Sequence, residues 1–181
     1  MENSNHLYLL LADILDYPTQ ALRVQVRECT SLIEKFSGEE AFSKMNAFLS
    51  FVEDTPLSRL EELYTSTFDL QVVCYPYAGY HIFGESYKRG EFLANLNARY
   101  SAIGFSPSNE LPDHISVLLR YLTKLQAEDD RHVIISECLI PAVTKMETHL
   151  TGGSPYLNVL QSLLIVLKNP ITTTLDSRRV A

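Results

Sequence analysis

The sequence predicts an all-α protein built as one globular domain of seven to eight amphipathic helices. Apolar side chains recur at spacings of three and four residues along most of the 181-residue chain. No segment of useful length shows the strict alternation that is typical of a half-buried strand. Glycine or proline separates most of the apolar stripes, which predicts short connections between helices. One domain is also the expectation for a chain of this length.

The first four helices are expected between residues 7 and 68. In the first, over residues 7–15, Leu7, Leu11 and Leu15 share a face, and Pro18 ends the helix soon after. Further apolar stripes cover residues 22–36, 42–52 and 57–68. Each of these stripes predicts a helix that buries one face against its neighbours.

Four more helices are expected over residues 92–103, 115–125, 134–146 and 157–167, after an irregular segment at 69–86. Pro141 is expected to kink the third of these helices, and Gly152-Gly153 to end it. Because glycine inside a helix costs about 1 kcal/mol relative to alanine, we expect close backbone packing at Gly90. Residues 1–170 are expected to form the helical domain, and 171–181 a flexible tail.

Composition and charge exclude several classes of protein. The net charge is −7, so the chain lacks the basic footprint of a nucleic-acid-binding protein. No apolar run approaches the roughly 18 residues that span a bilayer. Three scattered cysteines without a C-x-x-C motif argue against disulfides and structural zinc, and the first residues lack the basic region of a secretory signal. We therefore expect a cytoplasmic protein that neither binds nucleic acid nor inserts into a membrane.

An aromatic-rich segment between Tyr64 and Tyr87 is the first candidate for function. It contains seven of the chain's 18 Tyr and Phe side chains. Aromatic side chains offer a large contact area at low conformational cost, so such a segment is suited to line a groove for an apolar peptide. The alternative is that the rings fill the core where helices diverge. The candidates here are Tyr64, Phe68, Tyr77, Tyr80, His81 and Phe83.

A second candidate is the string Glu110-Leu111-Pro112-Asp113-His114, just before the helix at 115–125. A helix that begins at Asn109 would explain a proline in the first turn and carboxylates near the positive end of the helix dipole. It would not explain His114, because a cation is unfavourable there. On such a helix Glu110 and His114 would face one another.

An enzyme that uses Glu110, Asp113 and His114 with a metal is the alternative interpretation of this string. No further histidine or cysteine stands at ligand spacing, and no nucleophile motif or phosphate loop accompanies the three residues. We therefore expect neither catalysis nor a bound metal or cofactor.

Two strings also carry a resemblance to a known family. One is Glu110-Leu111-Pro112-Asp113-His114 with the Ile-Ser-Val-Leu-Leu-Arg-Tyr-Leu that follows it. The other is Leu63 to Leu70, followed by Gly79 to Gly90. Together they resemble the molybdoenzyme-assembly chaperones of the NarJ, TorD and DmsD type, and are most similar to the NarJ-like nitrate reductase delta subunits. The resemblance extends over about residues 7–168, but the stretch from Tyr75 to His81 departs from the nitrate reductase pattern and leaves the client enzyme open.

The resemblance implies a TorD-like helical fold, no catalysis and no cofactor. It implies a cytoplasmic chaperone that binds the N-terminal leader, often a twin-arginine signal, of a molybdenum-cofactor oxidoreductase catalytic subunit. Such a chaperone holds the apo-enzyme for cofactor insertion before export or membrane attachment. A helical adaptor subunit retained in an oxidoreductase complex is the alternative, and the sequence is compatible with a monomer or a dimer.

The resemblance and the aromatic segment together predict one peptide-binding groove. An apolar leader face would lie between helices, and basic leader residues would meet acidic residues at the rim. We expect the groove to be lined by Tyr64, Phe68, Tyr77, Tyr80, Phe83, Leu118 and Tyr121, near His81, with Glu110, Pro112, Asp113 and His114 at its edge.

Overall fold

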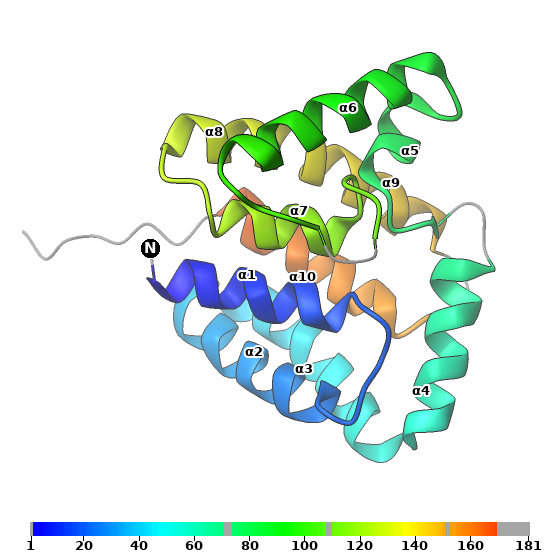
Figure 1. Cartoon of the computed structure of the whole chain (residues 1–181). Coiled ribbons are helices and arrows are strands. Elements are labelled where there is room, and N and C mark those ends of the chain that lie inside the picture. The colour runs from blue at the N-terminus through cyan, green and yellow to red at the C-terminus, as the bar shows by residue number, and fades with distance from the viewer. Residues whose placement is uncertain (1, 71–73, 108–109, 151–152, 170–181) are drawn as a thin grey trace, which may run out of the picture.

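A computed structural model of the chain describes residues 2–70, 74–107, 110–150 and 153–169. Within these ranges the ordered elements are helices, joined by short connections (Figure 1). The first half contains α1 (Glu2–Ile14), α2 (Leu22–Phe36), α3 (Glu39–Asp54), α4 (Leu57–Tyr64) and the π-helical turn η1 (Thr65–Asp69). The second half contains α5 (Ala78–Phe83), α6 (Tyr87–Ala102), α7 (Ile115–Leu122), α8 (Glu128–Val133), η3 (Ile134–Leu139), α9 (Ile140–His149) and α10 (Tyr156–Lys168).

The all-α prediction is confirmed, and all eight expected helices are present. The described residues contain no strand, apart from one isolated antiparallel bridge between Tyr77 and His114. None of the helices in the described ranges is long and apolar enough to cross a membrane. The expected tail at 171–181 lies outside the described residues. The prediction that Gly152-Gly153 ends the helix before it is wrong, because α9 ends at His149 with Leu150 as its C-cap.

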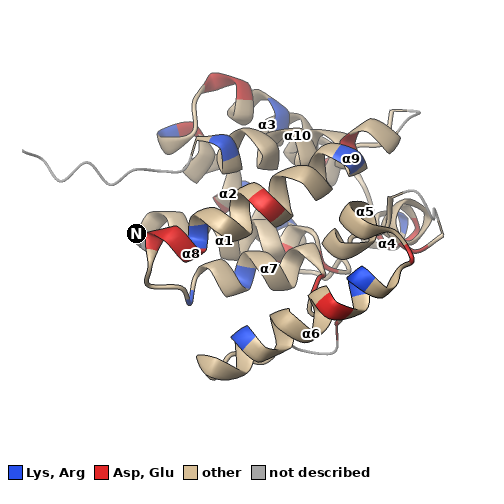
Figure 2. Cartoon of the chain, turned by 90° about the horizontal axis from the view of Figure 1, so that it is seen from above, with Lys and Arg blue, Asp and Glu red and all other residues tan. Residues whose placement is uncertain are grey.

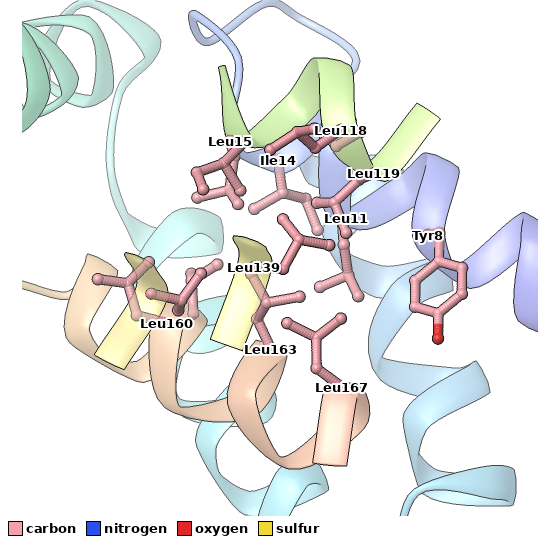
Figure 3. Close-up of a cluster of buried hydrophobic side chains, with 14 of the residues drawn as sticks. Tyr8, Leu11, Ile14, Leu15, Leu118, Leu119, Leu139, Leu160, Leu163 and Leu167 are labelled. Carbon is pink, nitrogen blue, oxygen red and sulfur yellow. The ribbon is translucent and has the colours of Figure 1, made fainter. Parts of the chain in front are cut away.

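Helix α10 lies at the centre of the molecule and packs against α3 and α9, while α1 packs against α2 and α7. Figure 3 shows leucines of α1, α7 and α10 pointing toward one another, with Leu139 of η3 among them. Eight of the 13 residues of α10 are buried, which suits a helix that is apolar on nearly all sides. Each buried leucine contributes about 1.5–3 kcal/mol relative to an exposed one, so this cluster is a main source of stability.

Two long helices contain a wider π-helical turn. Helix α4 continues directly into η1, and α8 continues through η3 into α9. Pro141 is the second residue of α9, which begins directly after η3. Because proline lacks a backbone N–H and its ring clashes with the preceding turn, a local change of helix winding at this point is expected. The structure thus shows a π-helical turn just before Pro141, while the kink expected at this residue stays a prediction.

The segment 69–86 differs from the expectation of irregular chain. Residues Ala78–Phe83 form the short helix α5, and Gly84 ends it with φ +65°. Six residues are too few to show a helical repeat in the sequence, and Pro76 and Gly79 disguise the pattern further. The prediction of close packing at Gly90 is wrong: nothing would lie within 4 Å of a Cβ there, and the tightly packed glycine is Gly79.

Candidate functional site

The string from Glu110 to His114 lies against the start of α5. The Ala78 amide donates to the Asp113 carbonyl at 2.8 Å, and the Ile115 amide donates to the Pro76 carbonyl at 2.8 Å. These two bonds flank the bridge between Tyr77 and His114. Segments that are far apart in the sequence thus meet, and the start of α5 is fixed against the start of α7.

Asp113 is fully buried, not at an exposed rim as predicted. Its Oδ2 accepts from the Gly79 amide at 3.1 Å and from Arg89 Nε at 3.2 Å. A Cβ at Gly79 would lie only 2.7 Å from that oxygen, so the glycine allows α5 to approach the carboxylate. The prediction failed because the α5 backbone, rather than solvent, covers Asp113.

His114 is also buried, and it is the N-cap residue of α7. Its Nδ1 accepts from the Ser116 amide at 3.2 Å and lies 2.7 Å from the Ser116 hydroxyl. Burial lowers the pKa of His114, while Glu110, Asp16 and Asp113 act in the opposite direction. A neutral ring with an unprotonated Nδ1 can cap a helix, which removes the difficulty of a cation at this position.

The predicted helix start at Asn109 is wrong, since α7 begins at Ile115 and Pro112 precedes the helix rather than lying in its first turn. Asn109 itself lies outside the described residues. Pro112 is buried, and its carbonyl accepts from the Tyr100 hydroxyl at 2.7 Å. The segment before α7 is therefore held by side-chain bonds rather than by helical ones.

Glu110 is the exposed acidic residue of the string, and it accepts from the Tyr77 hydroxyl at 3.1 Å. Burial and the neighbouring Glu110 raise the pKa of Tyr77 to about 12. The pKa of Asp69 is raised by partial burial and by Glu110. Asp16, just beyond the end of α1, is paired with Arg120 at 2.6 Å, and it contributes to the field at His114 together with Glu110. Acidic side chains from three separate segments thus gather around Tyr77 and His114.

Exposed apolar side chains neighbour these acids. Tyr17, 52% exposed, packs edge-on against Tyr64 at 5.5 Å between ring centroids. Leu70 is 73% exposed and Leu111 is 44% exposed, each next in the chain to an acidic residue. We name this set the acidic surface: Asp16, Tyr17, Asp69, Leu70, Glu110 and Leu111. The acidic surface can present negative charge and apolar area together.

Four predicted groove residues instead belong to the core. Tyr64 and Phe68 are buried and stack with Tyr156 of α10, at 6.1 Å and 4.8 Å between ring centroids. Leu118 and Tyr121 are buried on α7, where Tyr121 packs against Tyr100 at 4.5 Å. These four side chains thus fill the core, as the alternative interpretation expects, and none of them lines an open groove in this structure; peptide binding by them stays a prediction.

Three other predicted residues lie toward the C-terminal end of α5. His81 is buried, its Nε2 donates to the Tyr75 carbonyl at 2.7 Å, and burial lowers its pKa. Lys145 Nζ donates to the His81 carbonyl at 2.5 Å, and Phe83 packs against Phe92 at 5.4 Å. A cleft of about 410 Å³ here is lined by Tyr80, His81, Gly84, Glu85, Lys145 and His149. Tyr80 and His81 thus line this cleft and Phe83 packs against α6, whereas Glu110 is not among the residues that line the cleft.

The three residues of the metal-site alternative face different partners. Glu110 binds the Tyr77 hydroxyl, Asp113 binds Gly79 and Arg89, and His114 binds Ser116. In the part of the chain that the structure describes, no three His, Cys, Asp or Glu side chains are grouped so that they could hold a metal ion. The exposed Glu110 beside Tyr77 can provide negative charge and accept hydrogen bonds at the surface.

The comparison with protein families decides how this arrangement is classified. The family described as nitrate reductase delta subunit matches residues 37–146, which include α5, α6 and the string from Glu110 to His114. The chain belongs to the nitrate reductase delta subunit family. The resemblance stated from the two sequence strings is therefore confirmed.

Known proteins resemble this delta-subunit family member in sequence or in fold. The nitrate reductase molybdenum cofactor assembly chaperone NarJ of Escherichia coli K12 is 26% identical over 179 residues, covering 96% of this chain and 72% of that protein. NarJ of Escherichia coli O157:H7 matches equally well. A crystal structure described as a redox enzyme maturation protein from Archaeoglobus fulgidus superposes with a TM-score of 0.60 at 23% identity, covering 91% of this chain and 93% of that one. This last likeness shows the fold.

Sequence reasoning missed Asp16, Tyr17, Asp69 and Leu70 as candidates. Each lies at or just beyond the end of a helical element and at least 40 positions before Glu110, so no spacing rule connects them with the string. The available signal was weak: an acidic residue followed directly by an apolar one, at a helix end, in Asp16-Tyr17 and Asp69-Leu70.

Proposed function

We propose that this delta-subunit family member is a cytoplasmic maturation chaperone that binds the N-terminal leader of a molybdenum-cofactor oxidoreductase catalytic subunit. It holds the apo form of that subunit for cofactor insertion, before export or membrane attachment. The family match and the relation to NarJ support the general role in redox enzyme maturation. In this role the chain binds and releases a partner and catalyses no reaction.

The single observation that carries the leader-binding proposal is the acidic surface. Asp69 and Glu110 provide negative charge, while Asp16 beside them is paired with Arg120 at 2.6 Å. Tyr17, Leu70 and Leu111 provide exposed apolar area next to these carboxylates. A basic amphipathic leader would place its apolar face on these side chains and its basic residues against the carboxylates. Charge complementarity of this kind mainly accelerates encounter and selects the partner. Figure 2 shows Lys and Arg beside Asp and Glu on most helices, with a further run of acidic residues at the start of α8.

The test is calorimetric titration of the full chain with a synthetic N-terminal leader of a molybdenum-cofactor nitrate reductase catalytic subunit. We expect saturable binding near micromolar Kd, and no binding of a scrambled leader. In the variant Glu110→Gln we expect the affinity to fall about three- to tenfold, because one hydrogen-bonding charge is lost from the surface. A folded wild-type chain that binds no leader would refute the proposal.

The matched control is Asp129→Asn, which also removes one exposed negative charge. Asp129 lies on α8, at the opposite end of the molecule from α4 and η1 (Figure 1). We expect this variant to bind the leader as the wild type does. An equal loss of affinity in both variants would show that net charge, and not the acidic surface, attracts the leader.

A further inference from the structure

The buried carboxylate of Asp113 is incompletely satisfied. Both of its bonds, to Gly79 and to Arg89, end on Oδ2, while the buried Oδ1 has no hydrogen-bond partner within the described residues. Arg89 contacts the carboxylate through Nε alone, at 3.2 Å, rather than through the two parallel bonds that an arginine fork can form. A buried carboxylate oxygen without a partner is costly, so Asp113 retains capacity for a better cation.

Arg89 reaches Asp113 from the surface of the molecule. It stands in the first turn of α6, and its side chain is still 20% exposed. Of the 16 residues of α6 only Leu96 and Tyr100 are buried, and the helix runs along the outer edge of the molecule (Figure 1). Withdrawal of the Arg89 side chain would therefore disturb little packing, and it would leave Oδ2 of the carboxylate bonded to the Gly79 amide alone.

Tyr77 connects this pair with the acidic surface. The Arg89 guanidinium lies over the Tyr77 ring, 5.7 Å from its centroid, and the Tyr77 hydroxyl donates to Glu110. An arginine of a bound partner that pairs with Glu110 would therefore be separated from the position of Arg89 only by the Tyr77 side chain. The same ring face can carry either guanidinium by a cation–π contact.

We propose that Arg89 is an internal stand-in for an arginine of the client leader, and that Arg89 and Asp113 together determine specificity for that arginine. In the free chain Arg89 neutralises Asp113. On binding, the leader guanidinium displaces Arg89, lies over Tyr77 and uses both carboxylate oxygens. The proposal rests on leader binding as proposed above. It predicts selection of arginine over lysine, because only the planar guanidinium provides two parallel donors.

The test compares Arg89→Gln with Lys88→Gln by titration with the synthetic leader. Each variant removes one positive charge, but Lys88 is an exposed neighbour that the structure does not place on Asp113. We expect Arg89→Gln to bind the leader roughly tenfold more tightly than Lys88→Gln, since the competitor has been removed. The gain should vanish with a leader whose arginines are replaced by glutamine. Equal affinities in the two variants, or weaker binding by Arg89→Gln, would overturn the proposal.

A second measurement uses the wild-type chain, and so does not depend on how the variant folds. The Arg89 Nε–H signal is followed by nitrogen–proton NMR during titration with the leader. We expect the signal to move to the position of a solvent-exposed arginine as the leader saturates the chain. A signal that stays unchanged at saturation would refute displacement while leaving leader binding intact. Absence of any leader binding by the wild type would overturn both proposals.

Discussion

Replacement of Gly79 by alanine tests the central contact of the site. Gly79 lies inside α5, where its amide donates to Asp113. An added Cβ would lie 2.7 Å from Asp113 Oδ2, 2.9 Å from Phe92 Cδ1 and 3.2 Å from Arg89 Cγ. The first two distances are far shorter than an ordinary van der Waals contact. Either α5 must move away from the string at 110–114, or the carboxylate must give up its bonds.

The expected magnitude follows from two opposing effects. Alanine favours a helix over glycine by about 0.5–1 kcal/mol. Overpacking of a closed site costs about 1–3 kcal/mol, and any loss of the Asp113 bonds adds to this cost. We therefore expect Gly79→Ala to lower the free energy of unfolding by about 1–3 kcal/mol. Gly90→Ala is the matched control on α6: nothing lies within 4 Å of its Cβ position, so alanine should raise stability by about 0.5–1 kcal/mol.

The assay is urea unfolding of both variants and the wild type, followed by circular dichroism and analysed by linear extrapolation. The two substitutions are chemically identical and both lie in helices, so opposite signs isolate the contact with Asp113 and Phe92. A Gly79→Ala variant as stable as Gly90→Ala would show that α5 does not approach the carboxylate closely, and would refute the reasoning.

Three further predictions concern stability and reactivity. Phe68→Ala should lower the free energy of unfolding by about 3–5 kcal/mol, because the ring is buried against Tyr156. The control Tyr87→Ala removes a side chain that is 96% exposed and should change this free energy by less than about 0.5 kcal/mol. Equal urea midpoints of the two variants would contradict this. Burial lowers the pKa of His81 and His114 below their usual 6.5, so below about pH 6.5 the unfolded chain binds more protons than the folded chain, and the free energy of unfolding falls with pH. Urea midpoints should therefore decline from about pH 7.5 to about pH 5.5. A flat profile would refute the shift. Burial raises the pKa of the Cys74 and Cys138 thiols to about 11 and that of Cys29 further, so a disulfide reagent at neutral pH should label none of the three until urea is added.

Most of the fold could be predicted from apolar side chains at helical spacing, because the apolar stripe that buries a helix is a local feature of the sequence. The stripe at 57–68 predicted α4 and η1 as one continuous element, and the stripe at 22–36 matches α2. The short helix α5 was not predictable in this way, since most of its stability comes from contacts with α9 and with Asp113 rather than from its own six residues.

The candidate site was predicted in part. The string at 110–114 and Tyr77 were selected from the sequence, and the structure does bring Tyr77, Glu110 and His114 together. Their roles were not predictable from spacing. The neutral state of His114 depends on burial and on Ser116, and the burial of Asp113 depends on the backbone of α5.

By itself, the sequence determined the all-α class, the order of the eight long helices and the family, because these depend on local periodicity and on contiguous strings. Only the tertiary structure decided which aromatic rings are core and which are surface. Tyr64 and Phe83 were both candidates for the groove, yet one is 5% exposed and the other 36%. Tertiary packing also joined Asp16, Asp69 and Glu110 into one acidic surface and seated Arg89 on Asp113. Such contacts join residues distant in the chain, and their free energy depends on burial and on distance, which a one-dimensional pattern does not contain.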